Sequence, residues 1–389
     1  MPEPGRAALT VGVCTDATEF GDLGEQWNRL HRRSRSATPF QSHAWLHSWW
    51  LSYGSRGRLR VVLVRDGERL VAAAPLMRGP GPLARLVPLG GPLSDFHDVL
   101  IDDTSDDTSP DPGPDLAEQA ADALVEGFRE LARAAVIDFR EARPGSAVER
   151  VHARWRGPRH RLGDSLCLEL PAVPMDELVR RLPTPRAQRA RAKMRKLDAL
   201  GIEPRVVPAP EVGTSVHRLL ELHQLQWQGR KVTAEHLTPR FAEHLTRSVS
   251  LMVQAGDAVV TEFRLDDAVV AADLTLRSPR LAGGYLYGAD PGLRERKADV
   301  ATLLLRSCAD QLCAEPFGGG YTEPGVLSLL RGNEPYKRHW RPHTVVNQRL
   351  LFARRRTAPL LGAVLASAGA RATAKRALGA WRERGGGPP

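Results

Sequence analysis

Cysteine is scarce in this sequence, and the few cysteines form no recognisable pattern. The chain has four cysteines in 389 residues, at positions 14, 167, 308 and 313. They include no CxxC pair and no Cys/His spacing typical of zinc ligands, so neither a disulfide framework nor a metal site is expected. This usage fits a reducing compartment.

Long apolar runs are missing as well. No stretch of the chain reaches the roughly 18 apolar residues that a membrane span needs. The N-terminal segment MPEPGRAALTVGV lacks a basic region leading into an apolar one, which a secretory signal would have. We therefore expect a cytoplasmic protein.

The composition is that of a folded protein with a basic surplus. Hydrophobic residues make up 42% of the chain and charged residues 26%, which is typical of globular proteins. A length of 389 residues allows two or three domains, each with its own core. Lys and Arg outnumber Asp and Glu by 55 to 45, and this favours acidic partners such as phosphates, anionic lipid or nucleic acid.

The predicted elements occur in the same order in both halves of the chain. In the first half the pattern predicts helices at 19–33 and 42–53, then a hairpin at 59–77, a helix at 115–134 and a strand at 135–142. In the second half it predicts a hairpin at 258–277 and a strand at 281–289, then a helix at 298–315 and strands at 325–332 and 344–353. Because hairpins require antiparallel neighbours, the pattern predicts an α/β fold with mixed sheets of the α+β kind, not a doubly wound parallel sheet. We divide it into two similar domains, 1–164 and 165–355, and a basic tail, 356–389.

A strongly basic helix is predicted between the halves, over residues 184–201. Pro185 is placed to begin it and Gly201 to end it. A narrow apolar stripe of Ala190, Met194 and Leu197 contrasts with six Lys and Arg residues on the remaining surface. Two interpretations stay open, a solvated helix face and a helix that faces an anion.

Several segments, in this order, resemble one known group of enzymes. The segments are RKLDALG (195–201), LLELHQLQW (219–227), VVAADLTL (269–276), YLYGADPG (285–292) and GNEPYKRHW (332–340), together with TPFQSHAWLHSWW and GPLSDFHDVLI in the first half. The chain resembles GNAT-superfamily acyltransferases of the cellulose-biosynthesis acetyltransferase type, which are related to Fem-type peptidyltransferases. The resemblance implies two tandem GNAT-like domains, with acyl-CoA bound by the second.

A phosphate-bearing cofactor is expected at the loop and helix GLRERKADVATLLL (292–305). Helix N-termini favour anions, and Arg294, Arg296 and Lys297 would flank the first amides of a helix that begins near Ala298 or Asp299. With the preceding strand, the predicted cofactor-binding set is Tyr287, Gly288, Arg294, Arg296, Lys297, Ala298, Asp299 and Val300. This loop departs from the Gln/Arg-x-x-Gly-x-Gly/Ala pattern usual in GNAT enzymes, and the alternative is an ordinary basic loop that caps a helix.

Acyl transfer to an amine needs a base for the amine and an acid for the leaving thiolate. Glu262 and Asp273 are carboxylates within otherwise apolar strands, and Tyr285, Tyr287 and Tyr336 are candidate acids. Alternation along a strand would equally place either carboxylate on a face that meets water.

The segment LLRGNEPYK (329–337) concentrates polar groups at a strand end. In the family interpretation Glu334, Tyr336 and Lys337 hold the substrate or the acyl carbonyl; otherwise they form a capped turn above Trp340. His97 and Asp98, in the first half, are weaker candidates for substrate binding.

The function expected from the resemblance is acyl-CoA-dependent N-acyl transfer. The donor would be acetyl-CoA or another acyl-CoA, and the acceptor an amine of a small molecule or of a cell-envelope or polysaccharide precursor. One alternative is a Fem-type peptidyltransferase that uses aminoacyl-tRNA, the only case in which nucleic acid is expected. The other alternative is a catalytically inactive GNAT-like binding protein.

The tail is a candidate for peripheral contact with anionic membrane. Its Leu360, Leu361, Val364 and Leu365 follow helical spacing and are flanked by basic residues on both sides. A solvated tail is the alternative.

Overall fold

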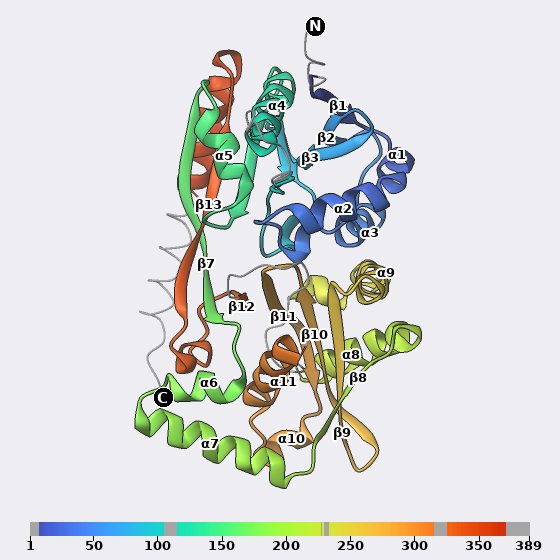
Figure 1. Ribbon diagram of the computed structural model, residues 1–389, viewed down its shortest axis with the longest axis vertical. Helices are drawn as coiled ribbons and strands as arrows, with labels where there is room; N and C mark the ends of the chain where they lie inside the picture. Colours follow the sequence, from blue (N-terminus) through green and yellow to red (C-terminus); the bar gives the residue numbers. More distant parts are fainter. Residues whose placement is uncertain (1–7, 105–114, 227, 229–232, 315–324, 371–389) are drawn as a thin grey trace, which may run out of the picture.

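The computed structural model describes residues 8–104, 115–226, 228, 233–314 and 325–370. Their strands form one 13-stranded sheet with the order β1-β2-β3-β4-β6-β13-β7-β12-β11-β10-β9-β8, and β5 pairs with β3. Figure 1 shows the sheet running through both halves of an elongated molecule, with helices on its two faces. The mixed α/β class predicted from the sequence is confirmed.

The N-terminal half supplies the strands β1 (Thr10–Cys14), β2 (Leu59–Asp66), β3 (Arg69–Arg78), β4 (Arg85–Pro88), β5 (Leu100–Ile101) and β6 (Val136–Ala142). Its helices are α1 (Ala17–Asp22), α2 (Gly24–Arg33), α3 (His43–Tyr53), α4 (Leu116–Leu131) and α5 (Ala147–Arg154). The predicted hairpin at 59–77 is β2 and β3, joined through Gly67, whose φ of 57° suits a residue without a side chain.

The C-terminal half repeats the arrangement. Its strands are β8 (Glu203–Val206), β9 (Ala258–Leu265), β10 (Ala268–Arg277), β11 (Leu281–Ala289) and β12 (Val326–Arg331), and its helices are α6 (Met175–Arg180), α7 (Thr184–Ala199), α8 (Val212–Gln226), α9 (Pro239–Gln254), α10 (Gly292–Glu295) and α11 (Val300–Ala314). Each half contains one parallel pair, β4 with β6 and β11 with β12, in a sheet that is otherwise antiparallel.

Two long strands connect the halves. The first part of β7 (Arg159–Pro171) pairs with the end of β13 (His343–Phe352), which also pairs with β6 of the N-terminal half. The last part of β7 pairs with β12 of the C-terminal half. The strand near the end of the chain therefore completes the N-terminal half, and a boundary at residue 164 falls inside β7.

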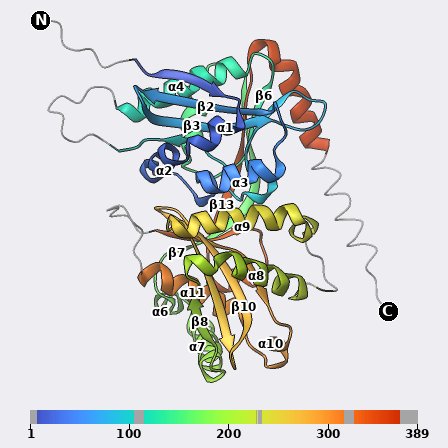
Figure 2. The same cartoon turned by 90° about the vertical axis from the view of Figure 1, so that its right-hand side faces the viewer.

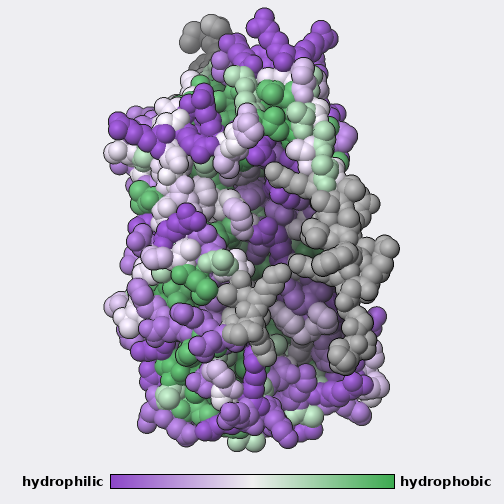
Figure 3. Space-filling view, turned by 180° about the vertical axis from the view of Figure 1, so that it is seen from behind, coloured by the Kyte–Doolittle hydropathy of each residue, from purple (hydrophilic) through white to green (hydrophobic). Residues whose placement is uncertain are grey.

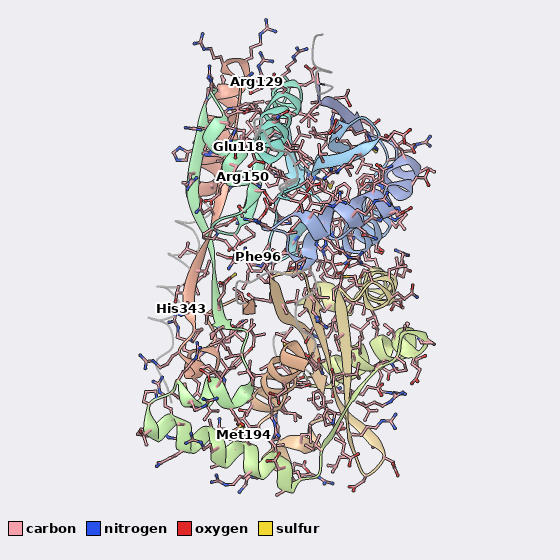
Figure 4. The ribbon with its side chains drawn as sticks, viewed as in Figure 1. Phe96, Glu118, Arg129, Arg150, Met194 and His343 are labelled. Atoms are coloured by element: carbon pink, nitrogen blue, oxygen red, sulfur yellow. The ribbon has the colours of Figure 1, made fainter. Side chains whose placement is uncertain are left out.

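The hydrophobic core crosses the junction of the halves. One cluster of buried side chains joins Trp27 and Trp45 of the N-terminal half to Phe241 and Leu274 of the C-terminal half. Figure 2 shows α3 lying against α9 at this level, where the Trp45 and His244 rings meet edge to face at 4.6 Å. Phe96 lies at the same level in Figure 4, 6.0 Å from the Phe40 ring. The halves are thus packed as one body.

The apolar stripe of the tail packs on the sheet. Residues 358–370 are helical, and Leu361 and Val364 are buried beside Val136, Leu351 and Ala353. The expectation that this stripe lies free to enter a membrane is therefore wrong for Leu361 and Val364, because the sheet needs the same apolar surface. Residues 371–389 lie outside the described part of the chain. Among the described residues no helix combines the length and apolar character that crossing a bilayer requires.

Candidate active site

The parallel strands β11 and β12 separate soon after they pair, and a cavity occupies the space between them. They pair only through Leu281–Gly283 and Val326–Ser328. Beyond this point Tyr285 is an extra residue on β11, between the pairs Leu274–Leu286 and Thr275–Gly284. On β12, Leu330 has a φ of 58° within a second irregularity. Because bulges bend strands, the two irregularities hold the strands apart.

This cavity has a volume of about 240 Å³ and an apolar wall with a few polar groups. The apolar wall includes Leu304 and Leu305 of α11, Leu327 of β12 and Trp340. The main polar lining groups are Asp273, Tyr285, Tyr287, Arg331, Tyr336 and Lys337. An apolar space with a few convergent polar groups is the usual form of a small-molecule site.

Asp273 is the lining group best suited to accept a proton. Its side chain is 5% exposed and accepts one hydrogen bond, from Thr275 Oγ1 at 3.0 Å. Burial raises the pKa of Asp273 to about 7, since low-polarity surroundings disfavour the charged form. A methyl group on Gly284 would lie 3.6 Å from Asp273 Oδ1, so the absence of a side chain there leaves room beside the carboxylate.

Glu262, the other candidate base, lies on the opposite face of the sheet. Its carboxylate accepts hydrogen bonds from Ser215 Oγ at 2.9 Å and from Arg218 at 2.8 Å, and it pairs with Arg205 at 3.3 Å. Burial raises the pKa of Glu262, but the hydrogen bonds and positive charges of these partners together lower it by more, so the net shift of the pKa is downward. Glu262 does not line the cavity and serves as the centre of an arginine cluster.

The polar residues after β12 satisfy one another and also face the cavity. Lys337, which is 8% exposed, donates to the Arg331 carbonyl at 3.0 Å and pairs with Glu334 at 2.8 Å. Tyr336 and Lys337 line the cavity, whereas Glu334 reaches it only through Lys337. Partial burial and the neighbouring Tyr287 and Glu334 raise the pKa of Tyr336 to about 12, so its hydroxyl keeps its proton at neutral pH.

The N-terminal half closes one side of the cavity, which sequence reasoning missed. Arg331, at the end of β12, forms an ion pair with Asp95 and donates to the Pro92 carbonyl at 2.7 Å. Tyr285 donates to the Leu93 carbonyl at 3.1 Å. The only sequence signal was an arginine at the end of an apolar run, and nothing local pointed to Asp95.

His97 and Asp98, the predicted substrate residues of the first half, have structural partners. The Asp98 carboxylate accepts from the amides of Ala147 at 2.9 Å and Val148 at 2.8 Å, and so caps the beginning of α5. His97 Nδ1 lies 3.0 Å from the Arg140 carbonyl. Neither residue lines the cavity between β11 and β12.

The predicted phosphate site at the start of α11 is partly occupied by the protein. Arg294 of α10, and Arg296 and Lys297 on the turn that follows it, are exposed ahead of this helix. Asp299 accepts from the Thr302 amide at 2.9 Å, and its other oxygen lies 2.5 Å from Lys193 Nζ of α7. Ala298 and Val300 pack against a small core cluster. A carboxylate therefore already takes one of the first amides of α11.

Gly288 has a packing role. A Cβ atom there would lie 2.3 Å from the His223 amide nitrogen and 2.7 Å from the Leu219 carbonyl oxygen, because the backbone of α8 crosses β11 closely. We expect Gly288→Ala to lower the free energy of unfolding by about 1–3 kcal/mol or more, as overpacking does. Urea denaturation tests this. Gly213→Ala of α8 is the control, because the nearest atom to its new methyl group would lie 3.9 Å away, at an ordinary contact distance. Equal midpoints for both variants would contradict the close approach.

Comparison with known proteins agrees with this geometry. Residues 185–338 match the sequence profile of an acetyltransferase (GNAT) domain. This region holds the separating strands, α11 and the polar segment after β12. The protein is an acyltransferase. No curated protein sequence matches the chain significantly.

Several solved structures share the fold over most of the chain. FemX superposes with a TM-score of 0.56 at 10% identity, over 84% of this chain and 95% of its own. The C-terminal domain of a putative lysylphosphatidylglycerol synthetase from Agrobacterium fabrum superposes with a TM-score of 0.54 at 11% identity, over 90% of this chain and 96% of that domain's chain. L-PGS from Bacillus licheniformis superposes with a TM-score of 0.51 at 10% identity, over 89% of this chain and 95% of its own. At these identities the similarity concerns the fold.

Proposed function

We propose that the protein transfers an acyl group from an acyl-CoA thioester to an amine, with Asp273 as the general base. The observation that carries this proposal is a buried carboxylate with a pKa of about 7, facing an apolar cavity between the separating strands of a GNAT domain. A base with this pKa is about half ionised at neutral pH, which suits proton removal from an ammonium or amine.

The proposed reaction is a direct transfer. The amine nitrogen attacks the thioester carbonyl carbon and its proton passes to Asp273, while the carbon–sulfur bond breaks. Tyr336 or Tyr287, which line the same cavity, gives a proton to the departing thiolate. When bound, the acyl-CoA supplies the activated acyl group and the leaving thiol.

The apolar wall limits what can enter the site. Leu304, Leu305 and Trp340 surround the space, so the acyl group and the acceptor meet in an environment that excludes much of the water. The acceptor is an amine on a small molecule or on a precursor of the cell envelope or a polysaccharide. Membership of the cellulose-biosynthesis acetyltransferase type is proposed with it.

The proposed location of the protein is the cytoplasm. The three cysteines whose side chains the structure describes are free thiols, which fits this location.

The experiment is a titration followed by an assay. Acetyl-CoA and longer acyl-CoAs are titrated against the purified protein, and release of free CoA thiol is then followed with a panel of primary amines. We expect saturable binding and amine-dependent thiol release. Absence of both with every acyl-CoA would contradict the proposed donor.

A second candidate is peptidyl transfer from aminoacyl-tRNA. The similarity of the fold to FemX over 84% of this chain and the exposed cations of α7 favour it. Binding to tRNA that weakens steeply with salt, together with no response to acyl-CoA, would select this candidate. Peripheral contact with anionic membrane remains proposed only for the basic residues around the tail helix.

A further inference from the structure

One face of α7 carries three cations, and two of them have no counter-charge in the described part of the chain. Arg186, Arg189 and Lys193 are spaced i, i+3 and i+7, so they lie along the same side of this helix. Lys193 pairs with Asp299 at 2.5 Å. Arg186 and Arg189 are exposed and form no ion pair or hydrogen bond with the described residues. Since like charges at this spacing oppose helix formation, the face is suited to a bound anion.

His339 lies next to this helix, because the adjacent Trp340 belongs to the buried cluster that also contains Ala187 and Ala190 of α7. This histidine lies in the short helix η5 (Lys337–Trp340), and its Nε2 is buried without a hydrogen-bond partner among the described residues. Burial lowers the pKa of His339, and the positive charges of Lys193, Arg186 and Arg189 lower it further, while Asp299 acts in the opposite direction. A neutral histidine with a free ring nitrogen beside three cations can hydrogen-bond to an incoming anionic group.

The cluster lies beside the cavity. Trp340, which follows His339, and Ala301, two residues after Asp299, both line the cavity between β11 and β12. Figure 1 shows α7 running along the end of the molecule next to α6, α10 and α11. An elongated ligand with its reactive end beside Asp273 would therefore place an anionic end near α7.

We propose that Arg186, Arg189, Lys193 and His339 form a phosphate-binding site for the donor, in place of the first amides of α11. This inference rests on the proposed function. Asp299 already accepts from the Thr302 amide, so a negative charge of the protein itself already lies at the N-terminus of α11 and would repel a second anion there. Arginine is well suited to phosphate because its guanidinium offers paired donors.

The opposite face of α7 provides a matched control. Arg191 and Arg195 are also exposed, but they border a different groove, formed with Met194, Asp198 and Arg306. Figure 4 shows Met194 on this helix, and its side chain packs partly against the cluster that includes Leu178. Replacing either arginine pair with glutamine removes two positive charges from α7 and changes only exposed positions.

The test compares the double variants R186Q/R189Q and R191Q/R195Q with the unaltered protein. Dissociation constants are measured for acetyl-CoA, for acetyl-pantetheine, which has no phosphate, and for inorganic pyrophosphate. We expect R186Q/R189Q to weaken acetyl-CoA and pyrophosphate by about 10-fold to 100-fold, as loss of hydrogen bonds to charged groups does. Its affinity for acetyl-pantetheine should not change, and R191Q/R195Q should stay within about threefold for all three ligands.

Three outcomes would overturn the proposal: unchanged acetyl-CoA affinity in R186Q/R189Q, equal weakening in both double variants, or no pyrophosphate binding by the unaltered protein. Acyl transfer from acetyl-pantetheine separates this inference from the proposed function. If transfer persists and the arginine variants bind normally, only the phosphate site is wrong. If pyrophosphate binds at α7 but no thioester binds, the phosphate site is supported for a different phosphate ligand, and the proposed acyl-CoA donor is rejected.

Discussion

Replacement of Asp273 by asparagine is expected to remove most acyl transfer while the fold remains intact. General-base catalysis typically contributes about 10²-fold to 10⁴-fold to the rate, and asparagine keeps the shape but cannot accept the proton. The loss should appear in kcat/KM for the amine, with little change in acetyl-CoA affinity. Glu262→Gln is the control, because Glu262 lies on the other face of the sheet among arginines.

The pH dependence of the unaltered protein provides a second readout of the same group. Burial raises the pKa of Asp273 to about 7, and only the ionised form accepts a proton. The value of kcat/KM should therefore rise with pH and level off above about 7, and this limb should be absent from the residual activity of Asp273→Asn. Equal losses in Asp273→Asn and Glu262→Gln, or the same pH profile in both Asp273 forms, would contradict the assignment.

Asp273→Asn should also raise the free energy of unfolding at neutral and higher pH, but not at acid pH. The native pKa of about 7 lies above the ordinary value of 3.8, so the folded protein holds the proton longer than the unfolded chain. The unaltered protein therefore loses stability as the pH rises from about 4 to 7. The asparagine variant escapes this loss, by at most about 4 kcal/mol above pH 7 and by nothing below pH 4. Thermal unfolding at pH 4 and pH 8 measures the difference.

Phe352→Ala should destabilise the N-terminal half although Phe352 belongs to the last strand. The ring is fully buried, and its centroid lies 5.3 Å from Phe128, 5.6 Å from Trp155 and 5.1 Å from His152. Truncation of a buried aromatic residue costs about 3–5 kcal/mol through lost contacts and the cavity left behind.

Urea denaturation measures this effect, and Val346 of the same strand is the control. Val346 is 49% exposed, so Val346→Ala should change the free energy of unfolding by no more than about 0.5 kcal/mol. Similar midpoints for Phe352→Ala and the unaltered protein would contradict the pairing of β13 with β6.

Figure 3 shows that the face seen from behind is mainly hydrophilic, with small separate apolar areas. No group of three metal-ligating side chains occurs among the described residues.

Local patterns in the sequence determined most of the elements. The hairpins β2–β3 and β9–β10, the helices α3, α4, α7 and α11, and the strands β6, β11, β12 and β13 lie where alternation, helical spacing and turn residues placed them. These signals are short-range, since side-chain periodicity and Gly or Asp turns act within a few residues. The predicted helix at 19–33 is divided into α1 and α2.

The same local signals failed for edge and shared strands. β1 and β8 lie at the two ends of the sheet and bury little, so their alternation is weak. β7 was missed because RHRLGDSLCLELP is exposed over its first part and buried over its last. A strand that serves two halves has no single period in its sequence, because each part meets a different neighbour.

The sequence by itself determined the residue types of the candidate site, namely Asp273, Tyr287, Tyr336 and Lys337 and the basic helix that contains Arg186 and Arg189. Only the tertiary structure decided which of them meet. It separated Asp273 from Glu262 by placing them on opposite faces of neighbouring strands, and it brought Asp95 from the other half to Arg331. The physical reason is that the direction of a side chain and the partner of a charge depend on strand register and on the packing of the halves, which no local pattern encodes.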